Sequence, residues 1–216
     1  MKLITKIIIF LLISFLIFYI YCVVLWYLNP SRLLGIKYNV KGKYNINDFN
    51  NRNYFFIVNH DNPCHTDIVI MSNEINKAKE GDKKYVFFSG KCDKICDYVY
   101  YKNKYEILQH TNNSIEKCKN ILLEDKKNLV FFLRPDAKGN GIYHILKQTK
   151  KPLVLVHKTL TKNPNNPNLS SNKLLFRGME YDIEYELIND YPIEKPAEDF
   201  MEWIKIKLYD KNNKKL

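Results

Sequence analysis

Twenty-two consecutive residues without a charge, from Ile7 to Leu28, constrain this chain more than any other feature. An α-helix rises about 1.5 Å per residue, so a helix of this length measures roughly 33 Å and matches the hydrocarbon core of a bilayer. Tyr and Trp side chains gather toward the far end of the segment, as they do in helices anchored at the membrane interface. We therefore predict an N-terminal membrane anchor, either single-pass or monotopic.

Two other interpretations of this segment fit less well. A buried core helix would need apolar partners on every side, which a small domain does not supply. The apolar region of a cleaved signal peptide usually runs about 7 to 15 residues and is therefore shorter. We predict that the segment is retained, with residues 1–30 as the anchor and residues 31–216 as one domain.

The rest of the chain is a basic body. The chain has 34 Lys and Arg residues against 23 Asp and Glu, and only Lys2 and Lys6 precede the end of the apolar segment. A positive body is attracted to nucleic acid and to the anionic cytosolic leaflet alike, but the anchor favours the membrane. Five cysteines form no regular framework, which favours free thiols in a reducing compartment. We expect a cytosolic body that contacts membrane lipids and no nucleic acid, and the sequence indicates no oligomeric state.

Segments typical of strands and helices alternate through the body. Apolar runs predict buried strands at 54–58, 85–88, 129–133 and 153–156, and helical spacing of apolar residues predicts helices at 68–78, 114–122, 141–149 and 196–208. Thr66 is the expected N-cap of the first helix. Segments 174–176 and 183–187 indicate two more strands, which we expect to pair antiparallel. This alternation predicts an α/β fold with a mixed sheet covered by helices.

The chemical signal follows directly after the first predicted strand, in the run Val58-Asn59-His60-Asp61-Asn62-Pro63-Cys64-His65-Thr66-Asp67-Ile68. His60 stands at the carboxyl end of a buried strand, where open α/β sheets place their active sites. Asp67 falls in the first turn of the next helix. A helix N-terminus stabilises an ionised carboxylate, which can then orient a nearby imidazole.

At these residues the chain resembles the glycerolipid acyltransferase family of the PlsC type. The first motif of that family is Asn-His, four residues and Asp, between a hydrophobic strand and an apolar helix, and Asn59 and His60 match its start. The fifth residue after His60 is His65 instead of Asp, so that the match to Asp67 requires a two-residue insertion in the turn. The resemblance implies a catalytic pair of His60 with Asp67, with Asp61 as the alternative carboxylate.

A later segment resembles the phosphate-binding block of the same family. The family sequence Phe-Pro-Glu-Gly-Thr-Arg is replaced here by Phe132-Leu-Arg-Pro-Asp-Ala, so the Glu is missing and Arg134 stands near the expected phosphate. The resemblance, which covers about Tyr54 to His157, implies that substrate phosphate is bound by Arg134, Lys138 and the backbone around Gly139 and Gly141, with Asn59 also at the substrate site. An Arg fork and close backbone approach at glycine suit a phosphate.

The resemblance also implies a reaction: transfer of an acyl group from acyl-CoA or acyl carrier protein to a hydroxyl of a lysophospholipid or glycerol phosphate. His60 would act as the general base on that hydroxyl, and Asp67 would hold the imidazole tautomer and stabilise the imidazolium. No cofactor is expected, since acyl-CoA is a co-substrate, and no metal is required.

Three alternatives remain open on the sequence alone. The chain could be a catalytically inactive, membrane-tethered lipid-binding protein of the same fold, because the Asp is shifted and the Glu is missing. A zinc site could be formed by members of the set His60, Cys64, His65, Cys92 and Cys96, although their spacing is unusual for zinc. Cys64 could also be a nucleophile paired with a neighbouring His, for which only sequence proximity argues.

Overall fold

The computed structural model describes residues 2–28, 36–50, 53–60, 64–78, 81–89, 105–109, 113–162 and 179–213. Its helices are α1 (Lys2–Leu28), the 3-10 helix η1 (Ile46–Phe49), α3 (Cys64–Lys77), α4 (Gly81–Lys84), α6 (Ser114–Leu123), α7 (Gly141–Thr149) and α8 (Ala197–Asn213). Its strands are β1 (Lys37–Lys41), β2 (Phe55–Asn59), β3 (Tyr85–Ser89), β4 (Glu106–Gln109), β5 (Asn128–Leu133), β6 (Leu153–Lys162) and β7 (Glu180–Ile188).

The described strands form one mixed sheet in the order β1-β7-β6-β2-β5-β3-β4. Strand β2 lies between β5 and β6 and is parallel to both. Strand β7 is antiparallel to β6, and β1 is parallel to β7, which makes the sheet mixed. The predicted α/β class and mixed sheet are confirmed.

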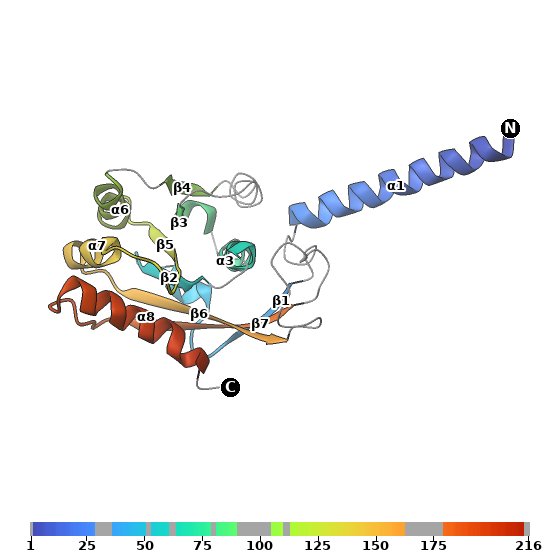
Figure 1. The fold of residues 1–216 in the computed structure, drawn as a ribbon. Helices are drawn as coiled ribbons and strands as arrows, with labels where there is room; N and C mark the ends of the chain where they lie inside the picture. Colours follow the sequence, from blue (N-terminus) through green and yellow to red (C-terminus); the bar gives the residue numbers. More distant parts are fainter. Residues whose placement is uncertain are drawn as a thin grey trace.

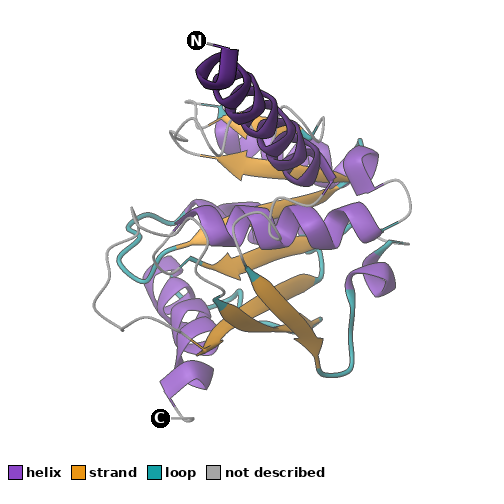
Figure 2. Ribbon diagram, turned by 90° about the vertical axis from the view of Figure 1, so that its right-hand side faces the viewer, coloured by secondary structure: helices purple, strands orange, loops and turns teal. Residues whose placement is uncertain are grey.

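Helices cover both faces of this sheet. Helix α3 and η1 pack on one face, and α6, α7 and α8 pack on the other (Figure 1). Figure 2 views the sheet from the side of α3, which crosses in front of the strands. The central strand β2 is buried at every position, which is why its sequence, FFIVN, is a nearly continuous apolar run.

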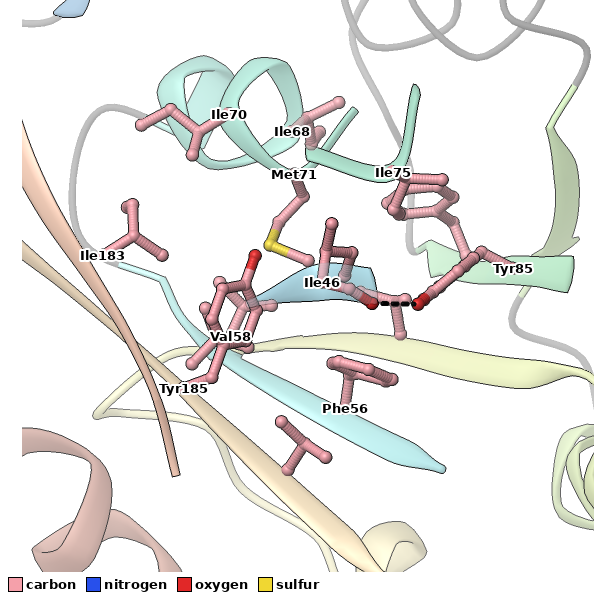
Figure 3. Close-up of a cluster of buried hydrophobic side chains, with 14 of the residues drawn as sticks. Ile46, Phe56, Val58, Ile68, Ile70, Met71, Ile75, Tyr85, Ile183 and Tyr185 are labelled. Atoms are coloured by element: carbon pink, nitrogen blue, oxygen red, sulfur yellow. Dashed lines mark hydrogen bonds between the residues drawn. The ribbon is translucent and has the colours of Figure 1, made fainter. Parts of the chain in front are cut away.

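The core on the α3 side fixes that helix over the sheet. Met71 reaches from α3 toward the strands, and Val58 of β2 and Tyr185 of β7 lie below it (Figure 3). The hydroxyl of Tyr85 donates to the carbonyl of Ile46, which ties β3 to η1. These contacts hold the first turn of α3 above the carboxyl end of β2.

Some boundaries differ from the sequence prediction. Thr66 was expected to cap the first helix, and this is wrong, because α3 begins at Cys64 and Thr66 lies inside it. Strand β6 continues to Lys162, well beyond the predicted end at Val156, because β7 pairs with it antiparallel over its whole length. Segment 174–176 lies outside the described residues. The two edge strands of the described sheet, β1 and β4, have five and four residues with charged or polar residues at their ends, so they contain no apolar run long enough to predict a strand.

Helix α1 extends away from the body (Figure 1). Its segment Ile4–Val23 has a mean hydropathy of 2.6 and is not buried against the rest of the protein, so it is long and apolar enough to cross a membrane. The predicted boundary at residue 30 falls among undescribed residues and stays a prediction.

A chain that begins at Ser31 tests the role of α1. We expect it to be soluble or to leave membranes in high salt, because the remaining attraction is electrostatic and is screened by salt. Membrane fractionation of the full and shortened chains measures this. Alkali-resistant membrane binding of the shortened chain would show that another segment is the main anchor.

Candidate active site

The candidate site lies where three parallel strands separate. Strand β2 ends at Asn59, which is in register with Leu133, the last residue of β5. The backbone N–H of His60 still donates to the carbonyl of Leu133 at 2.9 Å. Strand β6 continues past the end of β2, paired with β7. His60 therefore lies at the carboxyl edge of the sheet, between β5, which ends at Leu133, and β6, which continues.

The structure brings His60 and Asp67 together. The distance from His60 Nδ1 to Asp67 Oδ2 is 2.6 Å, and Asp67 is reached because it lies in the first turn of α3. The side chain of Asp67 is fully buried, and that of His60 is 19 % exposed. The alternative carboxylate, Asp61, lies outside the described residues.

A lysine that the sequence analysis did not identify completes the cluster. Lys158 of β6 donates from Nζ to Oδ1 of Asp67, so the two oxygens of one carboxylate hold an imidazole and an ammonium group. The side chain of Lys158 is only 3 % exposed, and its ammonium lies 5.2 Å from the centre of the Tyr181 ring. A charged lysine is rarely this buried without a partner of opposite charge.

This arrangement determines the chemistry of the imidazole. An ionised carboxylate only accepts hydrogen bonds, so Nδ1 of His60 carries the proton toward Asp67. The other nitrogen, Nε2, then has a free lone pair, and it has no hydrogen-bond partner among the residues that the structure describes. A partly exposed ring with a free, basic Nε2 has the form of a general base.

Further contacts fix the backbone of His60. The hydroxyl of Tyr209 on α8 accepts from the His60 N–H at 3.1 Å and donates to the carbonyl of Leu133. The ring of Phe132 lies 5.9 Å from the His60 ring, between centroids, and gives the site an apolar wall. The C-terminal helix and β5 thus both hold the base in place.

The structure places the side chain of Asn59 against β6. Its side chain is fully buried, its Nδ2 donates to the carbonyl of Lys158 at 2.9 Å, and its Oδ1 accepts from the Lys158 N–H at 2.6 Å. The amide therefore joins β2 to β6. Both of its polar atoms bond to the neighbouring strand, and contact between Asn59 and substrate stays a prediction.

The predicted phosphate-binding residues follow β5 directly. Arg134 is exposed and its guanidinium forms two hydrogen bonds with Asp136, at 3.0 and 3.1 Å. Lys138 is exposed, and Gly139 has a φ of +108°, a conformation that only glycine adopts without strain. Gly141 begins α7, and nothing lies within 4 Å of the position a Cβ would take at either glycine. The structure places this loop at the same sheet edge as His60.

A metal centre has no support in the described part of the chain. Within residues 2–28, 36–50, 53–60, 64–78, 81–89, 105–109, 113–162 and 179–213, no group of three or more His, Cys, Asp or Glu residues could hold a metal ion. Cys92 and Cys96 lie outside these residues, and the side chains of Cys64 and His65 are not described. Burial raises the pKa of the Cys118 thiol to about 12, so this cysteine is not a nucleophile at neutral pH.

The alternation of side chains along β6 indicates that Lys158 faces the core. Val154 and Val156 belong to the core beneath α3, and side chains two residues apart share a face of a strand, so Lys158 points to the same face. A lysine continuing a core-facing series requires a buried partner of opposite charge. The apolar run stops at Val156, so the sequence pattern predicts a strand that ends before Lys158.

A second buried carboxylate on α3 offers a comparison. Glu74 is 2 % exposed at its side chain and pairs with Lys77 at 2.5 Å, but the Lys77 side chain is 56 % exposed. Tyr38 and Tyr185 also interact with Glu74. Burial, with the Glu74 charge, raises the pKa of Tyr38 to about 12, so its hydroxyl stays protonated at neutral pH.

Replacing Lys158 should therefore destabilise the protein more than replacing Lys77. Lys158→Met leaves the Asp67 carboxylate buried without its cation, and we expect a loss of about 3 to 5 kcal/mol in the free energy of unfolding. Lys77→Met should cost less, about 1 kcal/mol, because Glu74 keeps the hydroxyls of Tyr38 and Tyr185 as partners when the ammonium is removed. Denaturant unfolding of both variants in the same detergent measures the difference, and equal losses would contradict the importance of the Lys158 pair.

A comparison with solved structures identifies a known protein with a similar fold. No protein-family model matches the chain, and a search of curated proteins finds no match. Among solved structures, the chain matches the crystal structure of the 1-acyl-sn-glycerophosphate (LPA) acyltransferase PlsC from Thermotoga maritima with a TM-score of 0.50. The match covers 82 % of this chain and 73 % of that one, at 16 % identity. The chain therefore has the mixed α/β fold of a PlsC acyltransferase.

Proposed function

We propose that this protein is a membrane-bound O-acyltransferase that moves a fatty acyl group from acyl-CoA or acyl carrier protein to a hydroxyl of a lysophospholipid or glycerol phosphate. The observation that carries the proposal is the 2.6 Å contact between His60 and Asp67 at the carboxyl edge of the sheet. The fold supports it, since a solved structure with the same architecture is an LPA acyltransferase. The apolar helix α1 supports a lipid substrate, because it would hold the site beside a bilayer.

The proposed reaction needs one proton carrier. An alcohol attacks a thioester slowly, because its proton must leave as the new bond forms. Nε2 of His60 takes the hydroxyl proton while the oxygen attacks the thioester carbonyl carbon. The carbon–sulfur bond then breaks, and the leaving thiolate receives the proton from the imidazolium. Asp67 keeps the ring in the productive tautomer throughout.

Substrate phosphate is proposed to bind at the loop after β5. Arg134 can form a bidentate pair with phosphate, but its fork is occupied by Asp136 in this structure. The pair is exposed, and exposed ion pairs are worth only about 0 to 1 kcal/mol, so a phosphate can replace the carboxylate. The open space beside Gly139 and Gly141 leaves the backbone N–H groups there accessible to the same ligand.

The catalytic pair is tested in membranes that contain the full chain. His60→Ala should lower acyl transfer from acyl-CoA to the acceptor by about 10² to 10⁴, since a positioned general base contributes that much. Asp67→Asn should cost nearly as much, whereas Asp61→Asn should have a mild effect. His144→Ala, which removes an exposed histidine of α7, is the matched control and should keep full activity.

Each outcome of this assay separates the alternatives. Full activity in His60→Ala would overturn the mechanism, and a large loss in Asp61→Asn with a mild one in Asp67→Asn would move the pair to Asp61. Absence of transfer by the unmodified protein with every donor and acceptor would favour an inactive lipid-binding protein.

The phosphate site is tested by a pair of opposite substitutions. Arg134→Ala should raise the KM for the phosphate-bearing substrate by about tenfold, with little change in kcat, because a charge-assisted bond is lost. Asp136→Asn should lower the same KM by up to about fivefold, because the guanidinium no longer has a competing partner. Steady-state kinetics with acyl-CoA and acceptor varied in turn identify the substrate concerned. Unchanged KM values in both variants would remove Arg134 from the site.

A further inference from the structure

We infer that Lys158 is a positioning residue for His60: it acts through Asp67, fixing the carboxylate toward the ring and offsetting its charge, so that His60 is available as a neutral base. The part of the inference that concerns catalysis rests on the proposed function, in which His60 is the general base. Its physical content, a coupling between Lys158 and the imidazole, can be measured without any substrate.

The first argument is geometric. Asp67 has one oxygen at 2.6 Å from His60 Nδ1 and the other bound by Lys158, so the plane of the carboxylate is fixed from two sides. Lys158 is itself held, because Asn59 bonds both its backbone N–H and its carbonyl. The position of Oδ2 opposite the ring is therefore set by β6 as well as by α3. A hydrogen bond held in this way directs the imidazole with little freedom.

The second argument is energetic. The side chains of Lys158 and Asp67 are 3 % and 0 % exposed, and the Tyr181 ring lies 5.2 Å from the ammonium. Burying an ion pair costs desolvation that an apolar residue of similar size would avoid. Packing alone does not explain a lysine here. Asp67 orients the His60 ring, and the Lys158 ammonium allows the Asp67 carboxylate to be both buried and ionised.

The third argument concerns the charge on the ring. A lone buried carboxylate beside an imidazole favours the imidazolium, which cannot accept a proton. The ammonium on the other oxygen opposes this effect, because it places a positive charge near the ring. A general base must be unprotonated at the operating pH, so the offset favours catalysis at neutral pH.

The charged and titratable groups around the ring come from several elements. Asp67 belongs to α3, Lys158 to β6 and Tyr209, whose hydroxyl contacts the His60 N–H, to α8. Tyr181 of β7 lies under the ammonium of Lys158, and Arg134 directs its guanidinium to Asp136. Among the described residues, Lys158 is a cation that shares a carboxylate with His60, so its removal should change how readily the ring accepts a proton.

The experiment follows the reaction of His60 with diethyl pyrocarbonate, which modifies neutral imidazole, as a function of pH. The full chain in detergent is modified briefly, and mass spectrometry quantifies the labelled peptide. In Lys158→Met and Lys158→Gln, the midpoint of the reaction at His60 should move to higher pH relative to the unmodified chain, because a positive charge beside the Asp67 carboxylate is removed. The Gln variant can still donate a hydrogen bond to Asp67, so it removes the charge while it keeps the contact.

Matched controls separate this effect from general destabilisation. Lys77→Met removes a lysine paired with another buried carboxylate of α3, two turns along the helix, and should leave the His60 midpoint unchanged. Lys158→Arg keeps the charge and should also leave it unchanged. His144, exposed on α7, reports the reactivity of the reagent in every sample.

Acyl transfer measured on the same samples distinguishes the two proposals. The acidic limb of kcat/KM against pH should move up with the midpoint in Lys158→Gln and stay in place in Lys77→Met. Absence of activity in every sample with a shifted midpoint would overturn the proposed function and keep the coupling. Equal midpoints in the unmodified chain and in folded Lys158→Gln, or an equal shift in Lys77→Met, would overturn the inference. A shifted midpoint in folded Lys158→Arg, which keeps the charge, would also overturn it.

Discussion

The carboxylate of Asp67 is the group on which the rest of the site depends. It is fully buried, and a charge in that position is tolerated only when partners surround it. Its two oxygens bind groups from β6 and from the end of β2, while its own backbone belongs to α3. One charged group therefore fixes the relative positions of three elements, and the apolar contacts of Met71 and Val58 complete their packing.

The site lies at the end of β2, where the pairing of the strands changes. Beyond Asn59, β6 loses its parallel neighbour and continues with β7 alone. This brings Lys158, which lies past the end of β2, level with the turn that carries His60. The side chain of Asn59 forms two hydrogen bonds with the Lys158 backbone and so joins β2 to β6. The Tyr209 hydroxyl accepts from the His60 N–H and donates to the Leu133 carbonyl, and so joins the end of β2 to β5. Polar side chains thus replace the ladder hydrogen bonds where the strands diverge.

The chain has a fold similar to that of PlsC, although its His-Asp motif and the loop after β5 differ in sequence from the family pattern. The His-to-Asp spacing is two residues longer than in the family motif, yet the two side chains meet at 2.6 Å. Helix α3 begins at Cys64, so Asp67 lies in the first turn of the helix and reaches His60 from there. The loop after β5 also differs, and there the exposed Arg134 is paired with Asp136. Insertions at a turn are tolerated because the strand and helix on either side are fixed by the core.

The sequence by itself determined the apolar helix, the alternation of strands and helices, and His60 with Asp67 as a candidate pair. These features depend on local patterns: hydrophobic periodicity, segment length and the first turn of a helix. Tertiary structure alone decided that Lys158 would join the pair and that Asn59 would join β6, because both contacts link residues about a hundred positions apart. A local pattern does not record which strand lies beside β2, and a lysine at the end of an apolar run looks like the end of a strand. Its role follows only once β7 extends β6 past β2 and α3 places a carboxylate above it.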